Sequence, residues 1–210
     1  SGLFKGNFKQ IASRLTWEAP QTFLGEFIGN VQNTFYGVRN VSDYGGATAI
    51  EFYKDHWGAF TLGSYINGQR GLYADPGNSL FQHEYGHYLQ SQSMGLFYLQ
   101  RVALPSLVDA WAHKNHSYHA AEQDANIRAL KYFSKHVRDF NIIDDSGRLL
   151  HTEWKWISNP IIGFNWEYSL NSDINQQALK AGRLSLGWAD YIFGPSLIIP
   201  GIIDILELKQ

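Results

Sequence analysis

His83-Glu84-Tyr85-Gly86-His87 is the stretch from which the rest of this chain is best understood. It has the form HExxH. On a helix, residues four apart lie about 40° apart around the axis, so His83 and His87 project from one face. Two imidazoles placed in this way can bind one Zn²⁺ at about 2.0–2.1 Å, with Glu84 beside them to hold a water. The stretch therefore predicts a helix that carries zinc ligands.

The flanking residues mark where this helix starts and ends. Residues 75–79 form a turn cluster, and Asn78 or Ser79 can cap a helix that starts at Leu80. Gly95 is a natural end. One stripe of the helix carries both histidines and the glutamate: Leu80, His83, Glu84, His87, Ser91 and Met94. We expect this stripe to face the protein interior.

A catalytic zinc site needs a third protein ligand and one open position. The segment 118–133 is the best source of this ligand, because it has apolar residues at helical spacing: Ala125, Ala129, Tyr132 and Phe133. Glu122 continues that stripe, whereas Asp124 lies on a mostly polar face. We therefore expect Glu122 to bind the metal and Asp124 to be solvated. Asn126, one turn beyond Glu122, can accept a hydrogen bond from a ligating histidine.

A short histidine-rich run precedes this second helix. His113, His116 or His119 is an alternative third ligand, since zinc accepts three imidazoles. One of these histidines, or Tyr118, could instead donate a hydrogen bond to the oxyanion of a tetrahedral intermediate. A solvated connector that has no part in the site is the simpler interpretation.

The two motifs resemble those of the gluzincins, zinc metallopeptidases in which HExxH is followed on a second helix by Glu-x-x-x-Asp. The second motif here is Glu122-Gln123-Asp124-Ala125-Asn126, so Asn126 stands in place of the aspartate. An amide oxygen still accepts a hydrogen bond from a histidine ring, but it brings no negative charge. The histidine would then be less strongly polarised.

A wider resemblance covers most of the chain. The segments that carry it are Thr16–Thr22, Asp43–Thr48, Thr61–Ile66, Ala74–Pro76, Leu80–Ser91 and Ala121–Asn126. They resemble a family of predicted metallopeptidase domains in bacteroidete proteins, often found at the C-terminal end of large Rhs/YD-repeat surface or toxin-like polypeptides. The resemblance implies an exported or cell-surface setting as part of a larger polypeptide. The chain starts Ser1-Gly2, which we also interpret as the start of a fragment.

We expect an α+β, zincin-like fold, in which a small antiparallel or mixed sheet precedes a helical lobe with the HExxH helix and a second ligand helix. A single domain, 1–210, would consist of a β-rich part (1–75), the ligand helices (76–140) and an aromatic-rich part (141–210). Residues 31–66 are expected as strands. Within them, residues 57–66 fit a strand at the cleft edge that pairs with an extended substrate. An interior strand without substrate contact is equally compatible with the sequence.

Composition narrows the functions that are possible. The net charge is −2 and the pI about 6.4, so no basic footprint points to nucleic acid or to an anionic membrane surface. The absence of cysteine leaves histidines and carboxylates as metal ligands. Hydrophobic residues make up 44% of the 210, which is enough for a compact core.

Three apolar stretches lack a functional motif. Residues 99–111 are apolar enough to be buried. The aromatic side chains Trp154, Trp156, Trp166 and Tyr168 are expected in a core and, less favoured, in a cleft wall. Residues 191–206 contain two prolines and two glycines and fall short of the roughly 20 residues that a membrane span needs, so we expect a buried segment.

The expected function is zinc-dependent hydrolysis of peptide bonds in a peptide or protein substrate, as in a gluzincin-like endopeptidase. Zinc held by His83, His87 and Glu122 would lower the pKa of a bound water toward about 7. Glu84 would accept the proton as general base and deliver it to the leaving amine. Two alternatives stay open: a non-catalytic, zinc-stabilised structural or adhesive module, and a domain that cuts its own parent chain.

Overall fold

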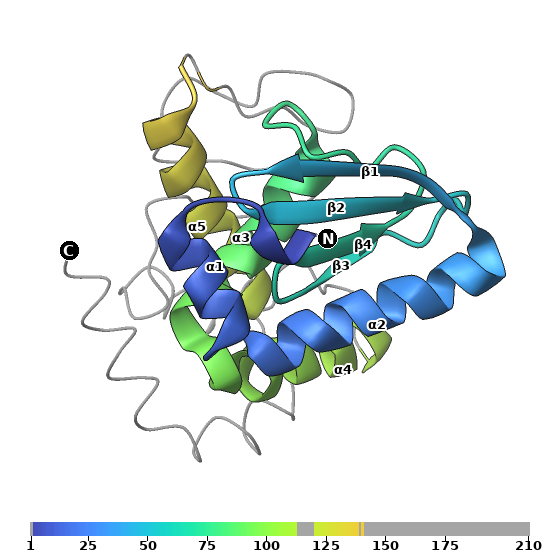
Figure 1. The fold of residues 1–210 in the computed structure, drawn as a ribbon, viewed down its shortest axis with the longest axis horizontal. Helices are drawn as coiled ribbons and strands as arrows, with labels where there is room; N and C mark the ends of the chain where they lie inside the picture. The colour runs from blue at the N-terminus through green and yellow to red at the C-terminus, as the bar shows by residue number, and fades with distance from the viewer. Residues whose placement is uncertain (1, 113–119, 139, 141–210) are drawn as a thin grey trace. The chain divides into compact units, whose positions relative to one another are not determined.

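The computed structural model describes residues 2–112, 120–138 and 140 (Figure 1). The chain divides into two compact units, Ser1–Leu96 and Phe97–Gln210, which are described separately. The fold is α+β, with helices and a small mixed sheet of four strands, as the sequence predicted.

Two helices open the first unit, after a 3-10 turn at Gly2–Phe4. Helix α1 (Phe8–Leu15) starts at a capping box, in which Asn7 and Gln10 each accept a hydrogen bond from the other's backbone N–H. Helix α2 spans Ala19–Tyr36. The expectation that strands start at residue 31 was therefore wrong for residues 31–36. The helix ends only where the Asn33 side chain accepts from the Val38 N–H.

The sheet has the strand order β1-β2-β4-β3. Its strands are β1 (Val38–Tyr44), β2 (Ala47–Phe52), β3 (Ala59–Leu62) and β4 (Tyr65–Gly68). The pairs β1–β2 and β3–β4 are antiparallel, whereas β2 and β4 run parallel. Gly45 and Gly46, with φ of 53° and 91°, form the two-residue turn between β1 and β2, where such turns need positive φ.

The single strand expected over residues 57–66 is instead two strands joined by a tight turn. Gly63 has a φ of 58° at this turn, and a Cβ there would lie 2.2 Å from Oγ1 of Thr22. The turn therefore packs so closely against α2 that Gly63 leaves no room for a side chain. Strand β3 ends the sheet on its side within the described residues, whereas β4, which starts at Tyr65, lies between β2 and β3. Of the two positions that the sequence left open, the edge is thus observed for β3 alone.

Helices α2 and α3 (Ser79–Met94) cover opposite faces of the sheet (Figure 1). Thr61 and Leu62 show this, because neighbouring side chains in a strand point to opposite faces. Leu62 packs beside Gly25 of α2, whereas the Thr61 hydroxyl reaches Glu84 of α3. Large side chains fill the core with almost no exposure: Phe52, Ile66, Phe81 and Tyr85.

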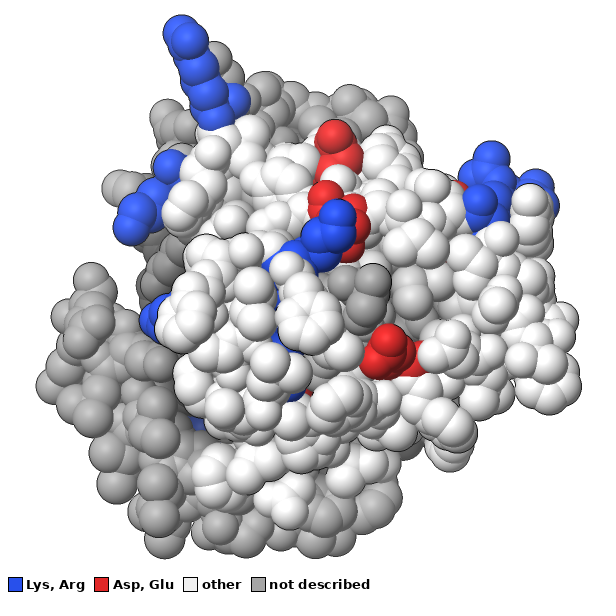
Figure 2. Space-filling view, viewed as in Figure 1, with Lys and Arg blue, Asp and Glu red and all other residues white. Residues whose placement is uncertain are grey.

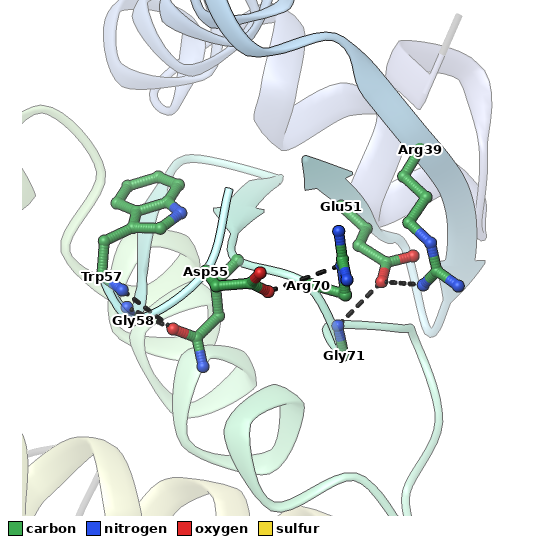
Figure 3. A network of polar contacts seen from close by, with 8 residues as sticks. Arg39, Glu51, Asp55, Trp57, Gly58, Arg70 and Gly71 are labelled. Carbon is green, nitrogen blue, oxygen red and sulfur yellow. Dashed lines mark hydrogen bonds and ion pairs between the residues drawn. The ribbon is translucent and has the colours of Figure 1, made fainter. Parts of the chain in front are cut away.

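A polar network joins the loops that follow β2 and β4 (Figure 3). These loops start at the same end of the sheet, because the two strands are parallel. Glu51 accepts hydrogen bonds from Arg39 at 2.5 Å and from the Gly71 N–H at 2.7 Å. The Gly71 carbonyl in turn accepts from Asn78, at the start of α3, at 2.8 Å. Gly71 thereby connects Glu51 of β2 to Asn78, the residue that precedes α3.

The charged side chains visible on one face of the molecule are scattered and separated by wide uncharged areas (Figure 2). Part of this uncharged surface belongs to α2, whose outer side carries exposed apolar residues at intervals of four: Phe23, Phe27, Val31 and Phe35. Among the helices of the described residues, none has the length and apolar character needed to cross a membrane.

The second unit is helical in its described part. A 3-10 turn (Gly95–Phe97) leads into a π-helical turn, Leu99–Ala103, followed by α4 (Leu104–Ala112) and α5 (Ala120–His136). The expectation of a buried segment over 99–111 holds for Val102 but not for Trp111, which is 84% exposed. The exposed residues Leu104, Leu107 and Trp111 all belong to α4, which therefore leaves part of its apolar surface exposed. The histidine-rich run 113–119 and residues 141–210, with their predicted roles, lie outside the described residues.

Candidate metal centre

Helix α3 carries the HExxH stretch and has the ends that the sequence predicted. Asn78 is its N-cap, with a side chain that accepts from the Phe81 N–H at 2.9 Å. Gly95 follows the last residue, Met94, with a φ of 55°. The capped start and the glycine end keep residues 83–87 within regular helix, which places both histidines on one face.

The two histidine rings lie next to each other. Their centroids are 4.9 Å apart and their planes are perpendicular. His87 is 6% exposed, and His83 is partly buried. The pair therefore has the spacing of HExxH-type ligands, as predicted.

A glutamine further along the same helix orients His87. Nδ1 of His87 lies 2.8 Å from Oε1 of Gln90, which has no exposed surface. An amide oxygen only accepts, so Nδ1 carries the proton and Nε2 becomes the nitrogen for a metal. The sequence predicted an acceptor of this kind on the second helix, at Asn126. The position of Gln90, three residues after His87 on the same helix, was the signal that could have identified this acceptor.

The carboxylate of Glu84 is held from the sheet. Thr61 of β3 donates to Oε2 of Glu84 at 2.7 Å, and its hydroxyl lies 3.0 Å from the Glu84 backbone oxygen. Both side chains are buried, at 5% and 4% exposed. No pattern in the sequence points to this role of Thr61, because its contact with Glu84 links positions 23 residues apart.

A second buried carboxylate, that of Glu18, contacts α3 from the short segment between α1 and α2. Glu18 accepts hydrogen bonds from Ser13 and, at 2.9 Å, from Ser91 of α3. Burial raises the pKa of the Glu18 carboxyl above its usual 4.5, and the hydrogen bonds from Ser13 and Ser91 and the charge of Arg14 oppose this rise. Glu18 thus ties α1 and α2 to the helix that carries the histidines.

Glu122 lies in the second unit, in the first turn of α5. It is 3% exposed, and its Oε1 accepts a hydrogen bond from Ser106 of α4 at 2.5 Å. The inward position expected from its helical stripe is therefore observed. Since the histidines belong to the first unit, their joining with Glu122 is part of the proposal below.

The expectation that Asp124 is solvated was wrong. Asp124 is only 6% exposed, and Arg128, one turn further along α5, donates to its Oδ2 at 2.7 Å. The arginine neutralises the carboxylate, which allows a residue on the more polar face to be buried. Asn126 is buried as well, and its hydrogen bond to a ligating histidine stays a prediction.

Two imidazoles and a carboxylate form the donor set of many catalytic zinc sites, and the chain has no thiolate to compete with them. The hydrogen bond at Nδ1 of His87 agrees with such a role, because ligating histidines usually donate their second ring N–H to an acceptor. The residues present therefore fit zinc.

Comparisons with protein-family models, with curated proteins and with solved structures gave no match for this chain.

Proposed function

We propose that this chain is a zincin-like, zinc-dependent peptidase that hydrolyses peptide bonds in peptide or protein substrates. The observation that carries the proposal is the side-by-side pair of rings of His83 and His87, together with the buried carboxylate of Glu84, the residue that follows His83 on α3. A purely structural zinc site has no need of a glutamate in that position.

Three side chains would hold the ion: His83, His87 and Glu122. Each offers one ligand atom, and His87 and Glu122 are buried. Zinc bound there would lower the pKa of a water ligand toward about 7 and polarise the substrate carbonyl. The position of Glu122 on the apolar stripe of α5 and its hydrogen bond from Ser106 support its choice over the alternative ligands.

Glu84 would act as the general base. Its Oε2 accepts from Thr61, so the other carboxylate oxygen takes the proton from the attacking water. The same oxygen then gives this proton to the amine nitrogen as the peptide bond breaks. Glu84 ends each cycle as a carboxylate, as it began.

Strand β3 would bind the substrate backbone. It ends the described sheet on its side, and an extended peptide can add to such a strand through main-chain hydrogen bonds. Because Thr61 of β3 contacts Glu84, a peptide paired with this strand would lie alongside the general base. This arrangement favours a peptide over a small-molecule substrate.

The test compares the 210-residue chain with its Glu84→Gln and Glu51→Gln variants. Glu51 is a matched control, since it is as buried as Glu84, at 4% exposed, but lies in the network of Figure 3. Zinc content is measured for each protein, together with cleavage of an unfolded protein and of a peptide library. We expect about one zinc per chain in all three, and a loss of about 10²–10⁴-fold in cleavage rate for Glu84→Gln alone.

The other outcomes are informative too. A wild-type chain that binds zinc but cleaves nothing would overturn the peptidase proposal in favour of the zinc-stabilised structural or adhesive module. A chain without zinc, whose stability is also insensitive to His83→Ala, would overturn the metal site itself.

A further inference from the structure

The Thr61 hydroxyl lies within hydrogen-bond distance of two oxygens of Glu84. Its oxygen lies 2.7 Å from the carboxylate Oε2 and 3.0 Å from the backbone oxygen of the same residue. A hydroxyl has one proton to donate, so it serves one acceptor at a time. The shorter contact is to the charged acceptor, which makes the stronger hydrogen bond.

We propose that Thr61 is a positioning residue that holds the Glu84 carboxylate in its reactive orientation. This inference rests on the proposed function and adds a residue to its machinery. With Oε2 engaged by Thr61, only the other carboxylate oxygen is presented to the reaction. A general base must lie within hydrogen-bond reach of the proton it takes, so a carboxylate that rotates away is inactive.

The strand makes Thr61 well suited to this task. Its χ1 is restricted because the side chain is β-branched, and β3 is held by antiparallel pairing of Thr61 with Ile66 on β4. The hydroxyl therefore approaches Glu84 from a rigid sheet instead of a loop. A long, flexible donor would lose more conformational entropy in fixing the same carboxylate.

The contact with Oε2 is compatible with each stage of turnover. In the proposed mechanism the proton is carried by the other carboxyl oxygen, so Oε2 is an acceptor throughout and can keep its hydrogen bond from Thr61. The carboxyl group can thus hold the proton, and pass it to the leaving amine, without leaving its place.

Three variants test the inference: Thr61→Val, Thr61→Ser and Thr48→Val. Valine keeps the shape of threonine but removes the donor, whereas serine keeps the donor. Thr48 is a matched control on β2, since it is 3% exposed and also donates to a carboxylate, that of Asp43, at 2.7 Å. For each we would measure kcat, KM and zinc content, and solve crystal structures of both Thr61 variants.

We expect Thr61→Val to lose about 100-fold in kcat with KM and zinc content unchanged, because the base is misplaced while ligands and substrate contacts remain. Thr61→Ser should recover most of the loss, and Thr48→Val should behave as wild type. The crystal structures should show the Glu84 carboxylate displaced by valine and retained by serine.

Equal kcat in Thr61→Val and Thr48→Val would overturn the inference while leaving the peptidase proposal intact. If the wild-type chain does not cleave, the peptidase proposal fails and the crystal structures decide the positioning role alone. A Glu84 carboxylate that keeps its place in Thr61→Val would then refute it, and one displaced by valine but kept by serine would support it.

Discussion

His87 and Gln90 are joined by a hydrogen bond of 2.8 Å between Nδ1 of the ring and the amide oxygen, one helical turn apart on α3. Both side chains are buried, at 6% and 0% exposed. This bond sets the tautomer in which Nε2 is the nitrogen left to accept a metal. The helix that carries the two proposed zinc ligands thus also supplies the acceptor that orients one of them.

Replacement of Gln90 by leucine should therefore weaken zinc binding by about 10–100-fold, the usual effect of losing such an outer acceptor. Zinc affinity would be measured by competition with a chromophoric chelator. Gln82→Leu on the same helix is the control, since its amide bonds to the Pro76 carbonyl and not to a histidine. Equal affinities in the two variants would show that Gln90 has no part in metal binding.

The choice of Glu122 over Asp124 can be tested on α5 itself. Glu122→Gln should lower zinc affinity by more than about 100-fold, because loss of a ligand exceeds loss of an outer contact. Asp124→Asn should leave affinity unchanged, since that carboxylate is paired with Arg128. If neither variant changes zinc affinity, the third ligand is a different residue, and the histidine run 113–119 becomes the next choice.

Glu18 should make stability depend on pH in a definite direction. Its pKa is raised above 4.5 by burial, so the folded state binds its proton more tightly than the unfolded chain does. The contribution of Glu18 to stability is then greatest below pH 4.5 and is lost as pH rises through the raised pKa. At a pH above the raised pKa, the free energy of unfolding of Glu18→Gln should therefore be higher, relative to that of wild type, than it is at pH 4.

Urea unfolding of wild type and Glu18→Gln at intervals from pH 4 to 7 would measure this difference. Glu26→Gln removes the same charge from α2 at a partly exposed position and controls for net charge. The free energy of unfolding of Glu18→Gln minus that of wild type should rise with pH. If it stays constant or falls, the assigned direction is wrong.

Gly46 should be the least replaceable residue of the β1–β2 turn. Its φ is 91°, and a Cβ there would lie 2.6 Å from Oη of Tyr88 and 2.7 Å from the Arg14 guanidinium. Gly71 has a similar φ of 95° but open space around it. Gly71→Ala should therefore cost only the backbone strain, about 1–2 kcal/mol. Gly46→Ala should cost about 1–3 kcal/mol more, from overpacking.

Urea unfolding of both variants would separate the two effects. Equal losses of unfolding free energy would mean that Arg14 of α1 and Tyr88 of α3 move to accommodate the added methyl group, so that their contacts with the turn are not tight.

The local features of α3 were predictable because neighbouring residues determine them. Asn78 satisfies N–H groups of the next turn, Gly95 adopts a positive φ without strain, and a four-residue spacing places two histidines on one face. The strand ends were less predictable. Residues 31–36 have strand-like side chains but continue α2, and the turn at Gly63 depends on packing against Thr22, 41 residues earlier.

By itself, the sequence determined the α+β class, the helix with its histidine pair and the inward face of Glu122, since each follows from spacing along a helix or from residue type. Only the tertiary structure decided how Glu84 is held, because Thr61 reaches it from a strand on which sequence spacing carries no information. The burial of Asp124 likewise depended on Arg128 neutralising its charge. Periodicity shows which way a side chain points; the partner it meets is set by how the elements pack.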